Sequence, residues 1–151
     1  MDAARRIVGT LAERNETLSV AESCTGGLLS AAIVAVSGAS RVLVEGIVAY
    51  ANGAKTRRLG VPEERIEQFG AVSEETVRAM LAGLAADARV AVSGIAGPDG
   101  GTPGKPVGTV VIGVSYHGKE KISTHLFPGD RDAVRNAAVG RALELLATLL
   151  G

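Results

Sequence analysis

Three short segments of the chain combine polar side chains with glycine in patterns that suit chemistry on a small ligand. They are 22–27 (ESCTGG), 50–55 (YANGAK) and 93–106 (SGIAGPDGGTPGKP). Each follows a run of residues typical of a strand and leads into a loop or a helix. In α/β proteins, ligands bind beyond the carboxyl ends of strands and beside helix N-termini, so we expect these segments to form the functional site.

Ser23 is the candidate nucleophile. It stands where a predicted strand gives way to a Thr-Gly-Gly turn and then a helix. The backbone N–H groups of Thr25, Gly26 and Gly27 are expected to be free there and to stabilise an anion or a developing oxyanion. The alternative is that Ser23 or Thr25 only caps the helix, a role in which both residue types are common.

Lys55 is the candidate base that a serine nucleophile requires. Neither His117 nor His125 belongs to a recognisable triad, because both fall in a predicted hairpin. Lys55 falls in the first turn of a predicted helix, where the helix dipole and partial burial disfavour the charged amine and lower its pKa. Tyr50 can orient or relay the proton. The alternatives are a solvated lysine and a tyrosine at the surface edge of a strand.

Cys24 is the competing nucleophile. Successive strand residues face opposite sides of a sheet, so Cys24 and Ser23 are expected to point apart. Cys24 is therefore interpreted as a small packing residue beneath the turn. Glu22 shares the side of Cys24, and the sequence assigns it no role.

The loop 93–106 is the candidate phosphate site. It matches neither a Walker A loop nor the dinucleotide-binding glycine pattern. Its glycine amides, Gly97 among them, together with Lys105 are nevertheless suited to one phosphate group. Arg131, at the start of the last predicted helix, can add a bidentate contact. The alternative is a flexible surface loop with ordinary surface charges.

The elements that position these segments are predicted from periodicity, caps and turn residues. Strands are expected at 17–23, 42–50, 88–97, 107–116 and 121–127, the last two forming a hairpin around His117-Gly118. Helices are expected at 2–14, from Gly27 to about 37, and over 52–60, 62–70, 73–88 and 130–150. This order predicts one domain over 1–151, a three-layer α/β/α sandwich with a mixed, mostly parallel sheet and one antiparallel hairpin.

Two of these helices have clear apolar stripes. The helix that Ser73 caps is expected to bury Val77, Met80, Leu81, Leu84 and Ala88. The helix that Asp130 caps is expected to bury Val134, Ala138, Ala142, Leu145 and Leu149. Asn52 is expected to cap the helix that carries Lys55.

Composition excludes several classes of protein. Among 151 residues, Lys plus Arg and Asp plus Glu both number 16, and aromatic residues make up 3%. Zero net charge and few stacking side chains argue against nucleic-acid and membrane-surface binding. One cysteine excludes an intrachain disulfide and favours a cytoplasmic location. The uncharged stretch 23–40 has an apolar core of only nine residues, so we expect a buried helix and no membrane span.

Five stretches carry a family resemblance: AESCTGG (21–27), VAYANGAK (48–55), GAVSEETV (70–77), SGIAGPDGGTPGKPVGTV (93–110) and FPGDRDAVR (127–135). Together they resemble the CinA C-terminal-domain family, the nicotinamide-nucleotide amidases, in the form that lacks an added N-terminal domain. The resemblance implies hydrolysis of nicotinamide mononucleotide to nicotinic acid mononucleotide and ammonia, in pyridine-nucleotide salvage. One departure is Ala51-Asn52-Gly53, where relatives often have Ser-Asn before the Ala-Lys pair.

Carried onto this chain, the resemblance implies Ser23 as nucleophile, Lys55 as base and Tyr50 as a helper near the lysine, without metal or cofactor. The expected partner is the small-molecule substrate, and binding to nucleic acid or a membrane is not expected. A homo-oligomer is also expected, first of all a dimer. The rival hypothesis is a non-catalytic nucleotide-binding or interaction module linked to competence or the DNA damage response.

Overall fold

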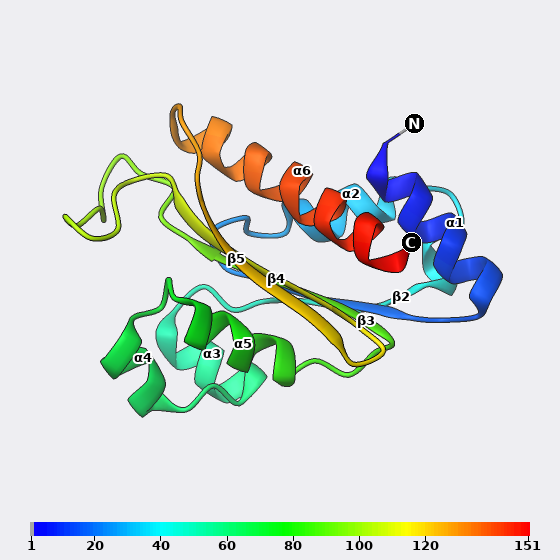
Figure 1. Ribbon diagram of the computed structural model, residues 1–151, viewed down its shortest axis with the longest axis horizontal. Helices are drawn as coiled ribbons and strands as arrows, with labels where there is room; N and C mark the ends of the chain where they lie inside the picture. Colours follow the sequence, from blue (N-terminus) through cyan, green and yellow to red (C-terminus); the bar gives the residue numbers. More distant parts are fainter. Residues whose placement is uncertain (1) are drawn as a thin grey trace.

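The computed structural model describes residues 2–151 and contains one five-stranded sheet flanked by helices (Figure 1). The strand order is β2-β1-β3-β4-β5, with bounds β1 Leu18–Glu22, β2 Leu43–Val48, β3 Ala88–Gly94, β4 Thr109–Tyr116 and β5 Lys119–Leu126. β1 pairs in parallel with β2 and β3, whereas β3, β4 and β5 pair antiparallel. The predicted α/β class and mixed sheet are confirmed.

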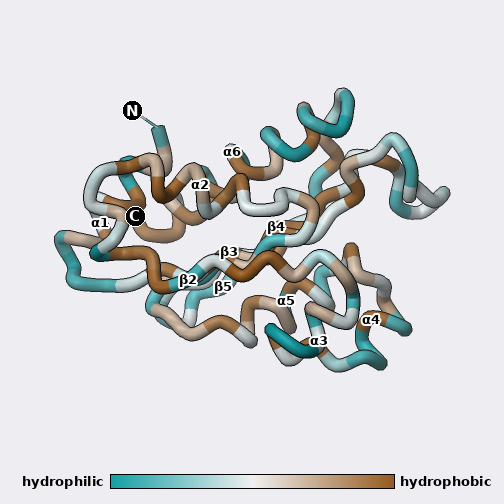
Figure 2. The backbone as a smooth tube through the Cα atoms, turned by 180° about the vertical axis from the view of Figure 1, so that it is seen from behind, coloured by the Kyte–Doolittle hydropathy of each residue, from teal (hydrophilic) through white to brown (hydrophobic). Residues whose placement is uncertain are grey.

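The helices form one layer on each face of the sheet. The layers are α1 (Ala3–Arg14), α2 (Leu28–Val34) and α6 (Arg131–Leu150) on one face, and α3 (Asn52–Leu59), α4 (Glu63–Phe69) and α5 (Glu74–Ala82) on the other (Figure 1). A short 3₁₀ helix, Ala39–Arg41, leads into β2. Figure 2 shows hydrophobic stretches along the strands between the two layers.

Side chains of the central strands alternate between two apolar cores. Val20 and Val90 belong to the core beneath α1, α2 and α6, whereas Ala21 and Ala91 belong to the core that contains Leu59 of α3. Because the alternation continues past the end of β1, Cys24 falls in the first core and Ser23 faces the layer of α3 and α5. The pleat of β1 therefore directs Ser23 toward the helix that carries Lys55.

Helix boundaries confirm two predicted caps and correct a third. The side chains of Ser73 and Asp130 accept hydrogen bonds from the amides of Thr76 and Ala133, as expected. The N-cap of the helix with Lys55 is Ala51, so Asn52 is its first helical residue and does not cap it.

The apolar stripes also differ in detail from the prediction. α5 ends at Ala82 with Gly83 as its C-cap, so Leu84 is buried in the following loop and Ala88 begins β3. A side chain at Gly83 would collide with the backbone of Leu59, so this C-cap position requires glycine. In α6, Leu146 and Leu150 are buried in the core, whereas Leu145 and Leu149 pack only partly against it.

No helix in residues 2–151 has the length and apolar character that a membrane crossing requires. Within the uncharged stretch 23–40, α2 is only seven residues long. It contacts β1 and β2 of the sheet and the neighbouring helices α1 and α6, while Val34 is exposed.

Candidate active site

Ser23 and Lys55 meet at the carboxyl end of β1. The Nζ of Lys55 lies 3.1 Å from the Oγ of Ser23 and donates a hydrogen bond of 3.0 Å to the backbone carbonyl of Tyr50. Lys55 is 1% exposed, on the face of α3 that packs against the sheet, and Ser23 is 7% exposed. The structure thus brings together two of the predicted site residues from segments that are 32 positions apart.

The surroundings of Lys55 favour its neutral form. Burial lowers the pKa of the amine from its ordinary value, because an ammonium group loses hydration inside the protein. Within residues 2–151, no carboxylate forms a salt bridge with Lys55. A neutral amine this close to a hydroxyl can accept its proton.

The turn after Ser23 offers fewer free amides than the sequence suggested. The amide of Gly26 donates to the Ser23 carbonyl (3.0 Å), and the amide of Gly27 donates to Oε1 of Glu22 (3.1 Å). The expectation of three free donors is therefore wrong for Gly26 and Gly27. In the part of the chain that the structure describes, the amide of Thr25 has no hydrogen-bond partner, and the residue itself is buried.

Tyr50 and Arg131 lie beside this pair. Arg131 donates from Nη1 to the Gly97 carbonyl (2.7 Å) and from Nη2 to the hydroxyl of Tyr50 (2.9 Å). Tyr50 therefore contacts Lys55 through its main chain, while its exposed ring reaches Arg131. Figure 1 shows the loop that follows β3 and the start of α6 at the same end of the sheet.

The side chain of Lys105 contacts a different segment of the chain from Arg131. Its Nζ donates to the carbonyl of Phe69, the last residue of α4, at 2.8 Å. Arg131 and Lys105, predicted to share one phosphate, thus bind different parts of the backbone in this structure.

Cys24 is buried at 4% exposure in the core below α6, as the alternation predicted. Burial raises the pKa of its thiol to about 11. A thiol with such a pKa is almost fully protonated at neutral pH, and the thiolate is the reactive form. The structure therefore favours Ser23 over Cys24 as the nucleophile.

Two residues that the sequence left without a role contact the turn directly. The carboxylate of Glu22 accepts hydrogen bonds from side chains and amides of the turn and of α2. Arg135 of α6 donates to the carbonyls of Cys24 and Thr25. The available signal for Glu22 was an acidic residue inside an apolar run just before a helix N-terminus, a place that favours negative charge.

Metal-ligating side chains gather elsewhere. Within residues 2–151, three such groups lie close together only at Glu16, Asp87 and His117. Glu16 and Asp87 precede β1 and β3, whereas Ser23 follows β1, so this group lies at the opposite ends of the strands. The hydroxyl of Tyr116 already donates to Glu16.

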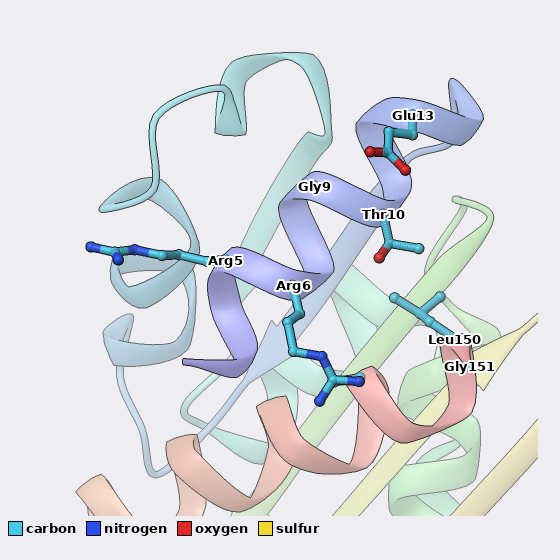
Figure 3. A pocket seen from close by; sticks show the side chains of 8 residues that line it. Arg5, Arg6, Gly9, Thr10, Glu13, Leu150 and Gly151 are labelled. Atoms are coloured by element: carbon cyan, nitrogen blue, oxygen red, sulfur yellow. The ribbon is translucent and has the colours of Figure 1, made fainter. Parts of the chain in front are cut away.

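A separate pocket of about 260 Å³ lies between α1 and the C-terminal end of α6 (Figure 3). Its lining includes Arg5, Arg6, Thr10, Glu13, Leu150 and Gly151, and none of the predicted site residues. This pocket is therefore distinct from the Ser23–Lys55 site.

The fold and the site define an α/β protein with a buried serine–lysine pair at the end of a central strand. The chain belongs to the CinA C-terminal domain family, whose model matches residues 1–150. It is 47% identical over 148 residues to a CinA-like protein of Kosmotoga olearia, covering 95% of this chain and 36% of that relative. A putative competence-damage inducible protein of Clostridium tetani is 49% identical, with 90% and 34% covered. The chain spans about one third of the length of these curated relatives.

Solved structures agree closely with this fold. The competence/damage inducible protein CihA of Agrobacterium tumefaciens superposes with a TM-score of 0.96 at 39% identity, covering 99% of this chain and 94% of that one. A competence or damage-inducible protein of Enterobacter asburiae gives 0.94 at 38% identity, with 99% and 96% covered.

Proposed function

We propose that the protein is an amidohydrolase that converts nicotinamide mononucleotide to nicotinic acid mononucleotide and ammonia. The substrate comes from the resemblance of its segments to the nicotinamide-nucleotide amidases. The chemistry is supported by one observation above all, the 3.1 Å separation between a buried lysine Nζ and the Oγ of Ser23.

In the proposed reaction, neutral Lys55 accepts the hydroxyl proton of Ser23 as Oγ bonds to the carboxamide carbon. The carbonyl oxygen becomes an oxyanion, to which the free amide of Thr25 donates. Loss of one such donor costs about 2.7–4 kcal/mol of transition-state stabilisation in other enzymes.

The intermediate then collapses as its C–N bond breaks. Protonated Lys55 returns the proton to the leaving nitrogen, which departs as ammonia and leaves an ester on Ser23. Water adds to the ester while Lys55 again accepts a proton. Protonated Lys55 then returns its proton to Oγ of Ser23 as the ester C–O bond breaks, which restores both residues. The carboxylic acid product ionises by releasing its proton to solvent.

The nucleotide phosphate is proposed to bind at Arg131. Its guanidinium contacts a carbonyl and a phenol, both neutral acceptors, and forms no salt bridge with a carboxylate within residues 2–151. A phosphate accepts stronger, charge-assisted hydrogen bonds and can displace these partners. Arg131 is also the first residue of a 20-residue helix, whose N-terminus favours an anion.

The experiment is an incubation of the purified protein with nicotinamide mononucleotide, with ammonia and nicotinic acid mononucleotide both quantified. Equal amounts of the two products, formed at a rate proportional to protein concentration, are expected. Binding of the mononucleotide without either product overturns the proposal in favour of a non-catalytic nucleotide-binding module.

A further inference from the structure

We infer that Glu22 and Arg135 are positioning residues that hold the turn 23–27, Glu22 as a hydrogen-bond acceptor and Arg135 as a hydrogen-bond donor. Glu22 accepts hydrogen bonds from N–H groups of the turn, and Arg135 donates to its carbonyls. Together they orient Ser23 and the Thr25 amide. This inference rests on the proposed function, and the experiment below separates its failure from the failure of that function.

The carboxylate of Glu22 receives five hydrogen bonds from the turn and from α2. Oε1 accepts from Thr25 Oγ1 at 2.6 Å, from the Gly27 amide at 3.1 Å and from the Leu29 amide at 2.9 Å. Oε2 accepts from the amide and hydroxyl of Ser30 at 2.9 and 2.7 Å. One oxygen therefore bonds the turn and the first residues of α2, and the other bonds only Ser30.

Glu22 is fully buried and forms no salt bridge in the described chain, so these hydrogen bonds are what stabilises its charge. Burial by itself raises the pKa of the carboxyl, but the bonds from Thr25 and Ser30 outweigh it and leave the pKa below its ordinary value. The group is thus ionised at neutral pH. An ionised Glu22 occupies the amides at the start of α2, which agrees with a substrate phosphate that binds elsewhere.

Arg135 reaches the same turn from α6, more than 100 residues away in the sequence. Nε donates to the Cys24 carbonyl at 2.9 Å and Nη2 to the Thr25 carbonyl at 3.2 Å. In a trans peptide the N–H points opposite to the C=O. By holding the Cys24 carbonyl, Arg135 therefore directs the Thr25 N–H to the other side of the turn, away from α6.

Two test variants and two control variants distinguish a role in positioning the turn from a role in stabilising the helix alone. Glu22→Gln keeps the side-chain volume but places an NH₂ group against N–H and O–H donors, and Arg135→Lys cannot reproduce the two-pronged contact. The matched controls are Glu144→Gln and Arg141→Ala, which each remove one partner of a surface ion pair on α6, the helix that carries Arg135.

The measured quantities are kcat and KM for nicotinamide mononucleotide, each normalised to folded protein, and the melting temperature. We expect kcat to fall about 100-fold or more in Glu22→Gln, the loss associated with one oxyanion donor, with KM changed less than about threefold. Arg135→Lys is expected to lower kcat in the same way, and both controls to retain wild-type kcat. A fall in melting temperature with unchanged kcat in Glu22→Gln and Arg135→Lys overturns the inference, because both residues would then only stabilise the helix and the loop.

If Glu22→Gln does not fold, Thr25→Val replaces it, because this variant loses the 2.6 Å bond to Glu22 and keeps the backbone amide. Labelling with a fluorophosphonate provides a readout that does not depend on amide turnover. If the wild type releases no ammonia, the proposed function fails. The positioning inference is then upheld by slower labelling of Ser23 in Glu22→Gln and Arg135→Lys than in the controls, and overturned by equal labelling.

Discussion

The amine of Lys55 contacts the hydroxyl of Ser23 inside the protein, with no carboxylate to balance a positive charge on the lysine within the described residues. Ser23 stands at the end of a central strand and Lys55 in the first turn of α3. The strand pleat, the start of α3 and the packing of α3 against the sheet together create this contact. The charge state of Lys55 therefore decides whether the pair can act.

The pH dependence of turnover follows from the pKa of Lys55. Burial lowers this pKa, so the neutral, active amine forms at a lower pH than it does for an exposed lysine, whose pKa is about 10.4. We expect kcat/KM to rise with pH through the lowered pKa and then to level off. A profile that is flat, or that falls over this range, contradicts the assignment of Lys55 as base.

Removal of Cys24 is expected to leave the proposed turnover intact. Its thiol is buried and its pKa is raised to about 11, so it contributes packing and not a nucleophile. Cys24→Ala is expected to keep kcat within about threefold of wild type while losing some stability, because it leaves a small cavity. Loss of ammonia release in Cys24→Ala, with activity retained in Ser23→Ala, transfers the nucleophilic role to Cys24.

Arg131 is expected to discriminate between a nucleotide and its dephosphorylated nucleoside. Hydrogen bonds to charged groups contribute about 1.5–3 kcal/mol, so Arg131→Ala should raise KM for the mononucleotide about tenfold or more. KM for the nucleoside should change little. Arg141→Ala, an exposed arginine on the same helix, is the control. Equal changes in KM for both substrates refute the phosphate role.

Glu22 couples the stability of the turn to pH. Because its pKa is lowered in the folded state, its stabilising contribution is present above the unfolded value of about 4.3 and is lost as pH falls through the folded value. The difference in unfolding free energy between wild type and Glu22→Gln should therefore be largest near neutrality and shrink in acid. Urea denaturation across a pH series measures it. A difference independent of pH argues against an ionised Glu22.

The layered fold could be predicted because its signals are local. Ser73 and Asp130 cap helices from their own residue types, and the hairpin turn at His117-Gly118 has the positive φ values (47° and 80°) that such turns adopt. The requirement for glycine at position 83, the C-cap of α5, could not be predicted, because it arises from a close approach of the Leu59 backbone on a different helix.

Residue types and the alternation of side chains along a strand were enough to predict part of the candidate site. Ser23 and Lys55 were found from their positions after a strand and at the start of a helix. Glu22 and Arg135 were missed, because the value of a buried charge depends on partners that only the folded chain supplies. Tyr50 was predicted to act through its side chain, whereas its carbonyl makes the contact with the lysine.

The most direct test of the account compares ammonia release from nicotinamide mononucleotide by wild type, Ser23→Ala and Lys55→Met, each shown to be folded by its melting transition. Methionine suits the buried site of Lys55 because it keeps an unbranched side chain without the amine. We expect kcat to fall at least about 10³-fold in both variants, as when either member of a catalytic pair is removed. Turnover within about tenfold of wild type in Lys55→Met or in Ser23→Ala would contradict the account.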